Sequence, residues 1–539
     1  MCNQLKKLDT EVCEGVIREQ GPVIHKVITT MDIPGRDGQL ICGAVIGSCP
    51  YPEVSEWNVP FPKPKPSENR SQEQIKSEGK TFTVLQLSDW HIDFDYLPGS
   101  EVNCNRPICC RAASTDNKNI TKKASMWGEY TCDSSLGLIE SLLRHIPKVE
   151  PNIRFSIFTG DIPPHDVWST LPFGKTQFIQ DQSYELFHSQ FDSPLLINSN
   201  VFPTVGNHES APANIFPLEH SNIPSKKAYL DLKWLYKSLA TNWQSWLGPD
   251  INSFVQSNTG SYVARPVPGL KLISLNTNFC YILNWWLYQQ PVQKDPNGIL
   301  AWLVNALQDS EDRNERVWII GHIPPGDGTC FHDYSNYYSQ IIDRYSHIIS
   351  AQFFGHTHKD EISLFYRSKQ EKTAENAISV AYIGPSVTPL IDLNPGFRTY
   401  KVDTKTFEIV DSITYIADLD KSVDKDSEPN WHVEYSAREA YNSSRAQITS
   451  PTSPLSASWW HNVTVDMENN EATFNKYHLF TSKSSPIIKE CDENCRKNTI
   501  CGIRAGNSEH RCDHLVNIYG RERYIAEPHL CGIPLTRKA

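Results

Sequence analysis

The sequence lacks any run of about 18 consecutive apolar residues, so it predicts no transmembrane helix. The first seven residues also lack the apolar core that a secretory signal peptide carries. They begin inside a cysteine-containing helical pattern, from which we expect an incomplete start. No internal repeat is present.

An excess of positive charge is also missing. The chain carries 51 Lys and Arg against 62 Asp and Glu, and its formal net charge is -11. This balance disfavours nucleic acids and anionic membranes as partners at neutral pH. Protonation of all 18 histidines would bring the net charge from -11 to +7, an upper limit, so a weakly acidic compartment could reverse the surface field.

Cysteine, by contrast, is abundant. The chain has 15 cysteines, many of them closely spaced, which is typical of proteins made in an oxidising compartment. Four Asn-x-Ser/Thr sequons agree with synthesis in the secretory pathway and with glycosylation. They lie at Asn69, Asn119, Asn442 and Asn462. We therefore expect a lysosomal or secreted protein, or one found in both places.

The length of 539 residues is too great for one core and predicts two or three domains. Residues 1–50 carry four cysteines and, near Val12–Val27, apolar residues at helical spacing, and they predict a small disulfide-bonded helical module. Residues 51–79 are rich in proline and predict an extended linker. Residues 80–417 have an α/β pattern, and residues 418–539 predict a helical, cysteine-rich C-terminal subdomain.

Short apolar runs in the α/β region predict buried strands, with helices between some of them and a final hairpin. The strands are expected at Phe82–Leu87, Ile153–Phe158, Val201–Val205, Leu270–Leu275, Val317–Ile320, Ala351–Phe354 and Val380–Ile383. The helices are expected at Ser134–Val149, Ile299–Leu307 and Ser339–Ile349, and the hairpin at Arg398–Asp403 with Phe407–Ile413.

Five of these predicted strands are followed by residues of the types that bind metal ions in proteins. Oxygen and imidazole donors at adjoining strand ends suit a divalent metal. Glycine stands beside four of the five donor groups, where the backbone can turn sharply and approach a ligand closely. The donors are Asp89, His91, Asp161, Asn207, His322, His356 and His358, and Asp161 is the natural candidate to bridge two ions.

This ordered set resembles the calcineurin-like metallophosphoesterases, and within them the acid sphingomyelinase family. The resemblance rests on Ser88–Leu97, Thr159–Trp168, Gly206–Ser210, Gly321–Gly326 and Phe354–His358, and it extends over nearly the whole chain. It implies an α/β fold, a metallophosphoesterase β-sandwich flanked by helices. A partial saposin-like module would precede this sandwich, and a disulfide-stapled helical subdomain would follow it.

The same resemblance implies site residues. One zinc ion would be held by Asp89, His91, Asp161 and His358, and a second by Asp161, Asn207, His322 and His356. His208 would protonate the leaving alkoxide as it departs, and His165 would bind the phosphate or share that role.

Disulfides are also implied by the family pattern. They are Cys104–Cys109, Cys110–Cys132, Cys280–Cys330, Cys491–Cys495 and Cys501–Cys512, with Cys2–Cys13 as a saposin-type bridge. Cys42 and Cys49 would lack partners within the chain, and Cys531 would be a free cysteine.

The function that the resemblance implies is zinc-dependent hydrolysis of sphingomyelin, in membranes or lipoproteins, to ceramide and phosphocholine. We expect a monomer that contacts membranes peripherally, with the aromatic stretch Tyr281–Tyr288 either meeting lipid or packed against the catalytic domain. One alternative is a sphingomyelinase-like phosphodiesterase acting on nucleotides or other soluble phosphate esters, a branch without the saposin-like module. The other is an inactive lipid-binding scaffold, against which the complete donor set argues.

Overall fold

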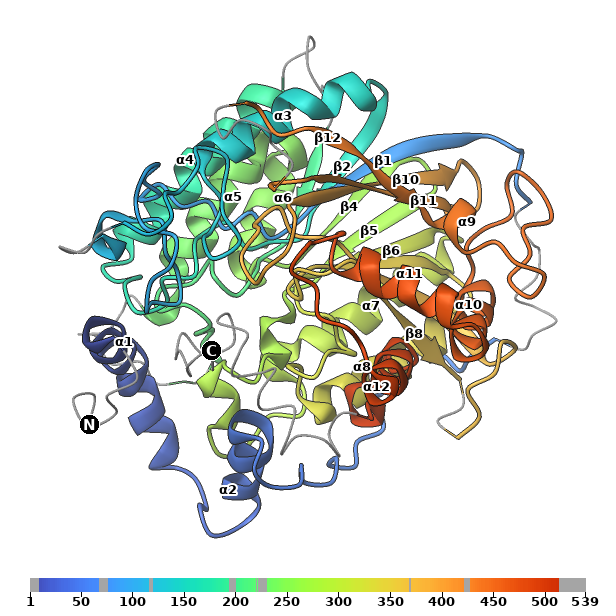
Figure 1. Ribbon diagram of the computed structural model, residues 1–539. Coiled ribbons are helices and arrows are strands. Elements are labelled where there is room, and N and C mark those ends of the chain that lie inside the picture. Colours follow the sequence, from blue (N-terminus) through green and yellow to red (C-terminus); the bar gives the residue numbers. More distant parts are fainter. Residues whose placement is uncertain are drawn as a thin grey trace.

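Two six-stranded mixed sheets pack face to face at the centre of the molecule (Figure 1). The computed structural model describes residues 9–66, 76–115, 120–192, 200–219, 221, 230–367, 370–420 and 427–512. Aromatic rings from the two sheets meet in the shared core, as Phe155 does with Trp318 at 5.6 Å between ring centroids. The first sheet has the order β12-β11-β10-β1-β2-β3, with β1 Thr81–Leu87, β2 Ile153–Phe158, β3 Val201–Pro203, β10 Gly396–Asp403, β11 Ile409–Ala417 and β12 Trp431–Ser436. The second has the order β4-β5-β6-β7-β9-β8, with β4 Tyr262–Val267, β5 Leu270–Ser274, β6 Arg316–Ile320, β7 Ile349–Phe354, β8 Glu361–Tyr366 and β9 Ala377–Ile383.

Each sheet contains a group of parallel strands, and the carboxyl ends of the strands in each group lie at one edge of that sheet. Strands β1, β2 and β3 are parallel in the first sheet, and β5, β6, β7 and β9 are parallel in the second. The carboxyl ends of parallel strands meet at one edge, where ligands are bound in open α/β sheets. All seven predicted strands and the predicted β10–β11 hairpin are confirmed. Strands β4, β8 and β12 were not predicted.

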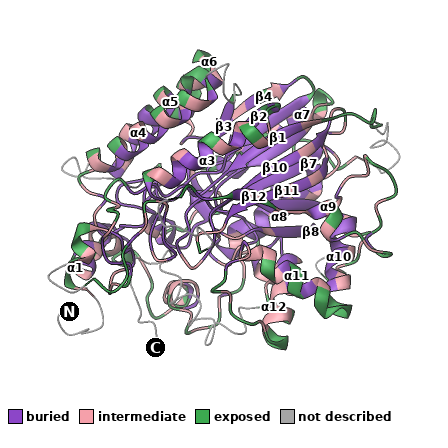
Figure 2. Cartoon of the chain, turned by 45° about the horizontal axis from the view of Figure 1, so that its top comes forward, coloured by how far each residue is buried: buried purple, intermediate pink, exposed green. Residues whose placement is uncertain are grey.

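Helices cover the outer faces of both sheets, and their buried sides turn inward (Figure 2). On the first sheet, Ser141 of α3 accepts a hydrogen bond from Trp431 Nε1 at 3.0 Å. On the second, Tyr338 of α8 donates to Gln352 at 2.6 Å. The helix predicted at 339–349 lies nearer the N-terminus than expected: α8 begins at His332 and ends at Tyr345. The helices are α1 Thr10–Ile28, α2 Arg36–Ile41, α3 Leu136–Val149, α4 Gly174–Phe191, α5 Lys233–Leu247, α6 Pro249–Ser257, α7 Ile299–Asp312, α8 His332–Tyr345, α9 Ala437–Ala440, α10 Ala457–Asn469, α11 Glu471–Thr481 and α12 Glu493–Ile503.

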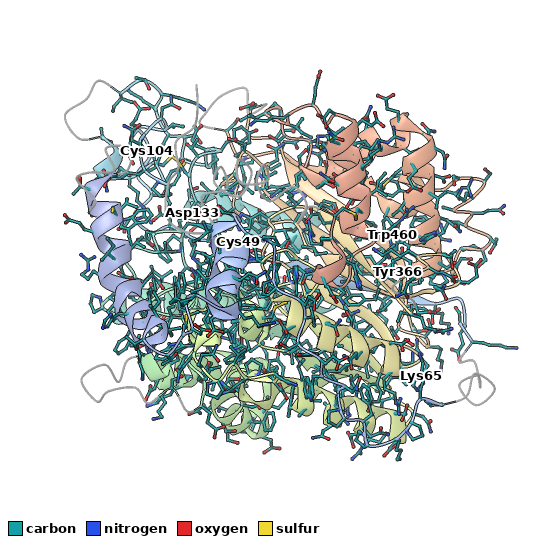
Figure 3. All side chains as sticks on the ribbon, turned by 90° about the horizontal axis from the view of Figure 1, so that it is seen from below. Cys49, Lys65, Cys104, Asp133, Tyr366 and Trp460 are labelled. Atoms are coloured by element: carbon teal, nitrogen blue, oxygen red, sulfur yellow. A yellow bond between two sulfur atoms is a disulfide. The ribbon has the colours of Figure 1, made fainter. Side chains whose placement is uncertain are left out.

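The C-terminal region is helical, as predicted, but it also supplies strand β12 to the first sheet. Helix α10 packs on the second sheet, where Trp460 Nε1 donates to the hydroxyl of Tyr382 at 3.3 Å. Figure 3 labels Trp460 beside Tyr366 of β8. The domain boundaries at residues 50, 79 and 417 remain predictions.

The disulfides correct one prediction and bear out five. Cys42 and Cys49 are bonded to each other, so the prediction that both lack partners was wrong. The short helical turn Cys42–Ile46 and the left-handed Gly47 bring their Cα atoms to 5.3 Å. Cys13 is disulfide-bonded, whereas its predicted partner Cys2 and the predicted free Cys531 lie outside the described residues. The five confirmed bridges are Cys104–Cys109, Cys110–Cys132, Cys280–Cys330, Cys491–Cys495 and Cys501–Cys512.

Residues 51–66 of the predicted linker run extended along helix α8. The backbone of Ser55 and of Val59 donates to Asp333 and Gln340 at 2.6 Å and 3.0 Å. Arg344 donates in turn to the carbonyl of Lys63 at 3.0 Å. The segment is therefore extended, as its prolines predict, and fastened to the second sheet's outer layer.

Helix α1 docks on the catalytic body through buried polar groups. The carboxylate of Glu19 is 2% exposed and accepts hydrogen bonds from the backbone of Thr170 and Leu171, each at 3.2 Å, and from the Thr170 hydroxyl. Gln20 donates to the carbonyl of Ala213 at 2.9 Å. These two contacts reach the segments that follow His165 and His208.

The aromatic stretch Tyr281–Tyr288 is packed against the domain, with only Trp285 partly exposed, which contradicts the interpretation that it meets lipid. Tyr281, Trp286 and Tyr288 are at most 1% exposed. The ammonium of Lys26, on α1, lies 5.2 Å from the centre of the Trp286 ring. The alternative interpretation, an aromatic loop packed against the domain, is the one that the structure supports.

Docking of α1 is expected to depend on pH through Glu19. Burial raises the pKa of Glu19 from its ordinary 4.5 to about 7. The stability that this group contributes is therefore complete below about pH 4.5 and is lost as pH rises through about 7, an effect of at most about 3 kcal/mol. Glu19→Gln should flatten the pH dependence of the unfolding free energy across this window, measured by urea denaturation.

The matched control is Glu14→Gln, an exposed glutamate on the same helix. Its stability profile should follow that of the unmodified protein. Identical profiles for both variants would contradict a role for Glu19 in this pH dependence.

Candidate metal centre

The seven predicted donors come together where five parallel strands end. Asp89 and His91 follow β1, Asp161 follows β2, Asn207 follows β3, His322 follows β6, and His356 and His358 follow β7. All seven are buried, and none is more than 6% exposed. The fold thus assembles one polar cluster from segments far apart in the sequence.

The backbone at this cluster adopts an unusual conformation. Five of the seven donors have a positive φ, a region that costs non-glycine residues about 1–3 kcal/mol each. They are Asp89, His91, Asp161, His356 and His358. Glycine is required beside them, because a Cβ at Gly355 would collide with Ser88 and one at Gly206 with Asp161. Strain of this kind concentrated at one place is typical of functional sites.

The first half of the cluster consists of Asp89, His91 and His358 around a common space. Asp89 Oδ1 lies 3.8 Å from His91 Nε2 and 3.5 Å from His358 Nε2. The two Nε2 atoms are 3.1 Å apart. Asp161 Oδ2 lies 3.5 Å from His91 Nε2 and so faces the same space.

The second half consists of His322, Asn207 and His356, again with Asp161. His322 Nε2 is 3.1 Å from Asp161 Oδ2 and 2.9 Å from Asn207 Oδ1. His356 Nδ1 is 3.0 Å from the same Asn207 oxygen. Because Asp161 Oδ2 faces His91 on one side and His322 on the other, this carboxylate joins the two halves.

Hydrogen bonds behind the rings orient them toward the shared space. His91 Nδ1 donates to the carbonyl of Pro163 at 2.8 Å, and His322 Nδ1 donates to that of Thr159 at 2.7 Å. The amide nitrogen of Asn207 donates to Asn214 at 2.8 Å, which turns its oxygen to the histidines. Partners of this kind fix the tautomer of metal-binding histidines.

The donor spacing fits a divalent metal. Bonds of about 2.0–2.2 Å to a tetrahedral metal place neighbouring donors roughly 3.4 Å apart, and the distances above run from 2.9 to 3.8 Å. Burial alone would raise the pKa of Asp161, but the imidazoles of His322, His208 and His91 hold it well below its usual range. Asp161 is therefore ionised and ready to bind a cation.

A third group of histidines adjoins the first half of the cluster. One ring nitrogen each of His91, His165 and His208 lies within 4.8 Å of the others. His208 Nδ1 donates to the carbonyl of Pro164 at 3.2 Å, which leaves Nε2 without the ring proton. Burial lowers the pKa of His208 to about 3, so this imidazole is neutral at rest.

Two acidic residues at the site were not assigned by sequence reasoning. Asp133 (Figure 3) accepts from His165 twice, from Nδ1 and from the backbone nitrogen, each at 2.7 Å. Glu209 is buried and accepts from the backbone of Ile162 at 2.9 Å. Burial, followed by the nearby charge of Asp161, raises the pKa of Glu209 to about 8. Glu209 directly follows His208, so its position in the sequence could have identified it as part of the site. Asp133 has no potential metal ligand next to it in the sequence and could not have been identified in this way.

Comparison with known proteins agrees with this geometry. The calcineurin-like phosphoesterase model matches residues 82–360, which contain all seven donors, and the acid sphingomyelin phosphodiesterase C-terminal region matches residues 376–515. The fold is thus that of a calcineurin-like phosphoesterase, a hydrolase, and the buried His and Asp clusters imply a divalent metal.

Relatives define the family more narrowly. The chain is 35% identical to "Sphingomyelin phosphodiesterase" of Bos taurus over 96% of its own length and 79% of that protein. It is 35% identical to the Homo sapiens protein of the same name, over 96% and 78%. It is 33% identical to "Sphingomyelin phosphodiesterase B" of Dictyostelium discoideum, over 94% and 75%. The chain belongs to the sphingomyelin phosphodiesterase family.

Proposed function

We propose that this protein is a zinc-dependent phosphodiesterase that hydrolyses sphingomyelin to ceramide and phosphocholine. The observation that carries the proposal is the complete donor cluster in a chain whose similarity to sphingomyelin phosphodiesterases spans 96% of its length. Zinc is favoured over harder cations because four of the seven donors are imidazoles, ligands that suit zinc.

The proposed ligands divide between two ions. Asp89, His91 and His358 would hold one, and Asn207, His322 and His356 would hold the other. Asp161, which faces both groups, would be shared between them. The bound metal would supply Lewis acidity toward the phosphoryl oxygens and a water molecule of lowered pKa. Imidazole rings held by Pro163 and Thr159 keep the donor atoms in place without further movement.

His208 and His165 are proposed to handle the proton that the leaving ceramide oxygen requires. Nδ1 of His208 is engaged by Pro164, which leaves Nε2 to take up a proton, and the negative charge of a bound phosphodiester would favour its protonation. Asp133 orients His165 and stabilises its positive form through the 2.7 Å hydrogen bond. The two rings lie 4.6 Å apart between centroids, close enough to serve one substrate oxygen in turn.

The substrate implies contact with a membrane or lipoprotein surface. Among the described residues, every helix is too short or too polar to traverse a lipid bilayer. We therefore propose peripheral contact, by a monomer, in the lysosome or outside the cell. The six disulfides found in the described residues support an oxidising compartment.

The experiment that tests the function measures phosphocholine release from sphingomyelin vesicles, with and without a chelator, and restores the chelated protein with zinc. We expect release that chelation abolishes and zinc recovers. A nucleotide diester is offered in parallel. Hydrolysis of the nucleotide alone would favour the soluble-ester branch, and hydrolysis of neither substrate by the zinc-loaded protein would favour an inactive scaffold.

A further inference from the structure

A short segment at residues 386–388, here the bridging segment, connects the metal ligands with the C-terminal region. Its backbone nitrogens donate hydrogen bonds to the backbone carbonyls of two proposed metal ligands and of the residue before one of them. Ser386 donates to His358 at 3.2 Å, Val387 to Ser88 at 3.1 Å, and Thr388 to Asp89 at 3.1 Å. The bridging segment therefore fixes the backbone of two ligands that belong to different sheets.

The bridging segment also reaches the third histidine group. The hydroxyl of Thr388 donates to Asp133 Oδ1 at 3.3 Å, and this carboxylate oxygen in turn accepts from His165. A displacement of the bridging segment would thus move the ligand backbone and the carboxylate that orients His165 together.

Lys483 holds the bridging segment from the other side. It lies two residues beyond α11 and is completely buried. Its ammonium donates to the Ser386 carbonyl at 2.9 Å and to the Ser386 hydroxyl at 2.7 Å. The nearby carboxylates of Asp89, Glu434 and Asp360 also favour its charged form. A buried cation is costly unless its donors are used, and these two hydrogen bonds, together with the three carboxylates, offset part of that cost.

The turn that carries Lys483 is itself fastened near the site. The side chain of Asn394 donates to the Lys483 carbonyl at 3.0 Å. The backbone of Asp360, two residues after His358, donates to the Thr481 carbonyl at 3.1 Å. The lysine is thus held rigidly while its side chain extends to Ser386.

We propose that Lys483 is a positioning residue for the metal centre, holding the bridging segment and through it the backbone of His358 and Asp89. It touches neither metal nor substrate. The proposal rests on the proposed function only in that metal ions bind the seven donors, and it does not depend on the identity of the substrate.

Lys483→Met removes the ammonium and keeps the side-chain length, and it is tested with cobalt(II) as the metal. We expect cobalt to bind about 10-fold more weakly, the lower end of the cost of losing a direct outer partner of a metal ligand, because Lys483 acts on the ligands through Ser386. The visible absorption of bound cobalt should also change, because it reports the ligand geometry. Lys483→Gln, which retains an amide donor, should recover part of the affinity.

The control is Lys476→Met. Lys476 is exposed on α11 and also donates to a backbone carbonyl, that of Ala440 at 2.9 Å, away from the bridging segment. Its cobalt affinity and spectrum should match the unmodified protein. A folded Lys483→Met protein with unchanged affinity and spectrum would overturn the proposal.

Should Lys483→Met fail to fold, Ser386→Ala decides the question, since it removes one acceptor and leaves the lysine in place. Weaker cobalt binding by Ser386→Ala supports the proposal, and an unchanged spectrum and affinity overturn it. Cobalt binding needs no lipid, so failure of sphingomyelin hydrolysis leaves this test intact and separates the two conclusions.

Discussion

Asp161→Ala is expected to lose bound metal and nearly all phosphodiesterase activity. Asp161 Oδ2 is the oxygen that faces both halves of the cluster, at 3.5 Å from His91 and 3.1 Å from His322. Without Asp161, the two halves of the cluster lose the one carboxylate that faces both of them. Because metal Lewis acidity is worth several kcal/mol and about 1.4 kcal/mol is a factor of ten, kcat/KM should fall by about three orders of magnitude or more.

Metal content by elemental analysis and phosphocholine release are measured on the same Asp161→Ala sample. The control is Asp181→Asn, a half-buried aspartate on α4 that accepts from Ser238 and Asn242, away from the metal cluster. It should keep both metal and activity. Full metal content in Asp161→Ala would show that Asp161 does not bridge the ions.

His208→Ala is expected to separate metal binding from turnover. His208 lies outside both ligand sets, and its Nδ1 is engaged by Pro164. Its loss should therefore leave the metal content unchanged while kcat falls by about 10²–10⁴, the range that a general acid contributes. A substrate whose leaving group needs no proton, such as a nitrophenyl ester, should be affected much less.

The matched change is His188→Ala, a histidine on α4 whose Nδ1 lies 2.9 Å from Asp192. It should keep activity on both substrates. Equal losses on sphingomyelin and the nitrophenyl ester in His208→Ala would argue that His208 orients the site and does not donate a proton. Metal loss in His208→Ala would contradict the assignment altogether.

The cluster could be predicted from sequence because each of its potential donors stands within a few residues of the end of a buried apolar run. The pattern of β1 followed by Asp89 and His91, repeated at four more strand ends, needs only the rule that parallel strands present their carboxyl ends at one edge. Asp133 follows no strand, and it reaches His165 only because the chain folds back across 32 positions. Contacts of this kind leave no local pattern.

Other misses have physical causes as well. Helix α4 buries the polar Thr176, Gln180 and Ser183 alongside Ile179, Tyr184, Phe187 and Phe191, so polar residues interrupt the apolar pattern that would have revealed it. Gln180 is buried because it donates to the Glu209 carbonyl at 2.8 Å. The aromatic run at Trp285 and Trp286 has the composition of a lipid-binding surface, and the burial of Trp286 under α1 becomes visible only in the structure.

Because five strand ends converge on one cluster, metal binding should report how far folding has progressed. The proposed ligands run from Asp89 on the first sheet to His358 on the second, so neither sheet alone carries a complete proposed half-site. A chain that has formed only one sheet would offer only part of each ligand set, and its affinity for metal would be low. Metal loading should therefore come after the sheets have met, and the metal-to-protein ratio of a variant should report directly what fraction of its molecules completed that step.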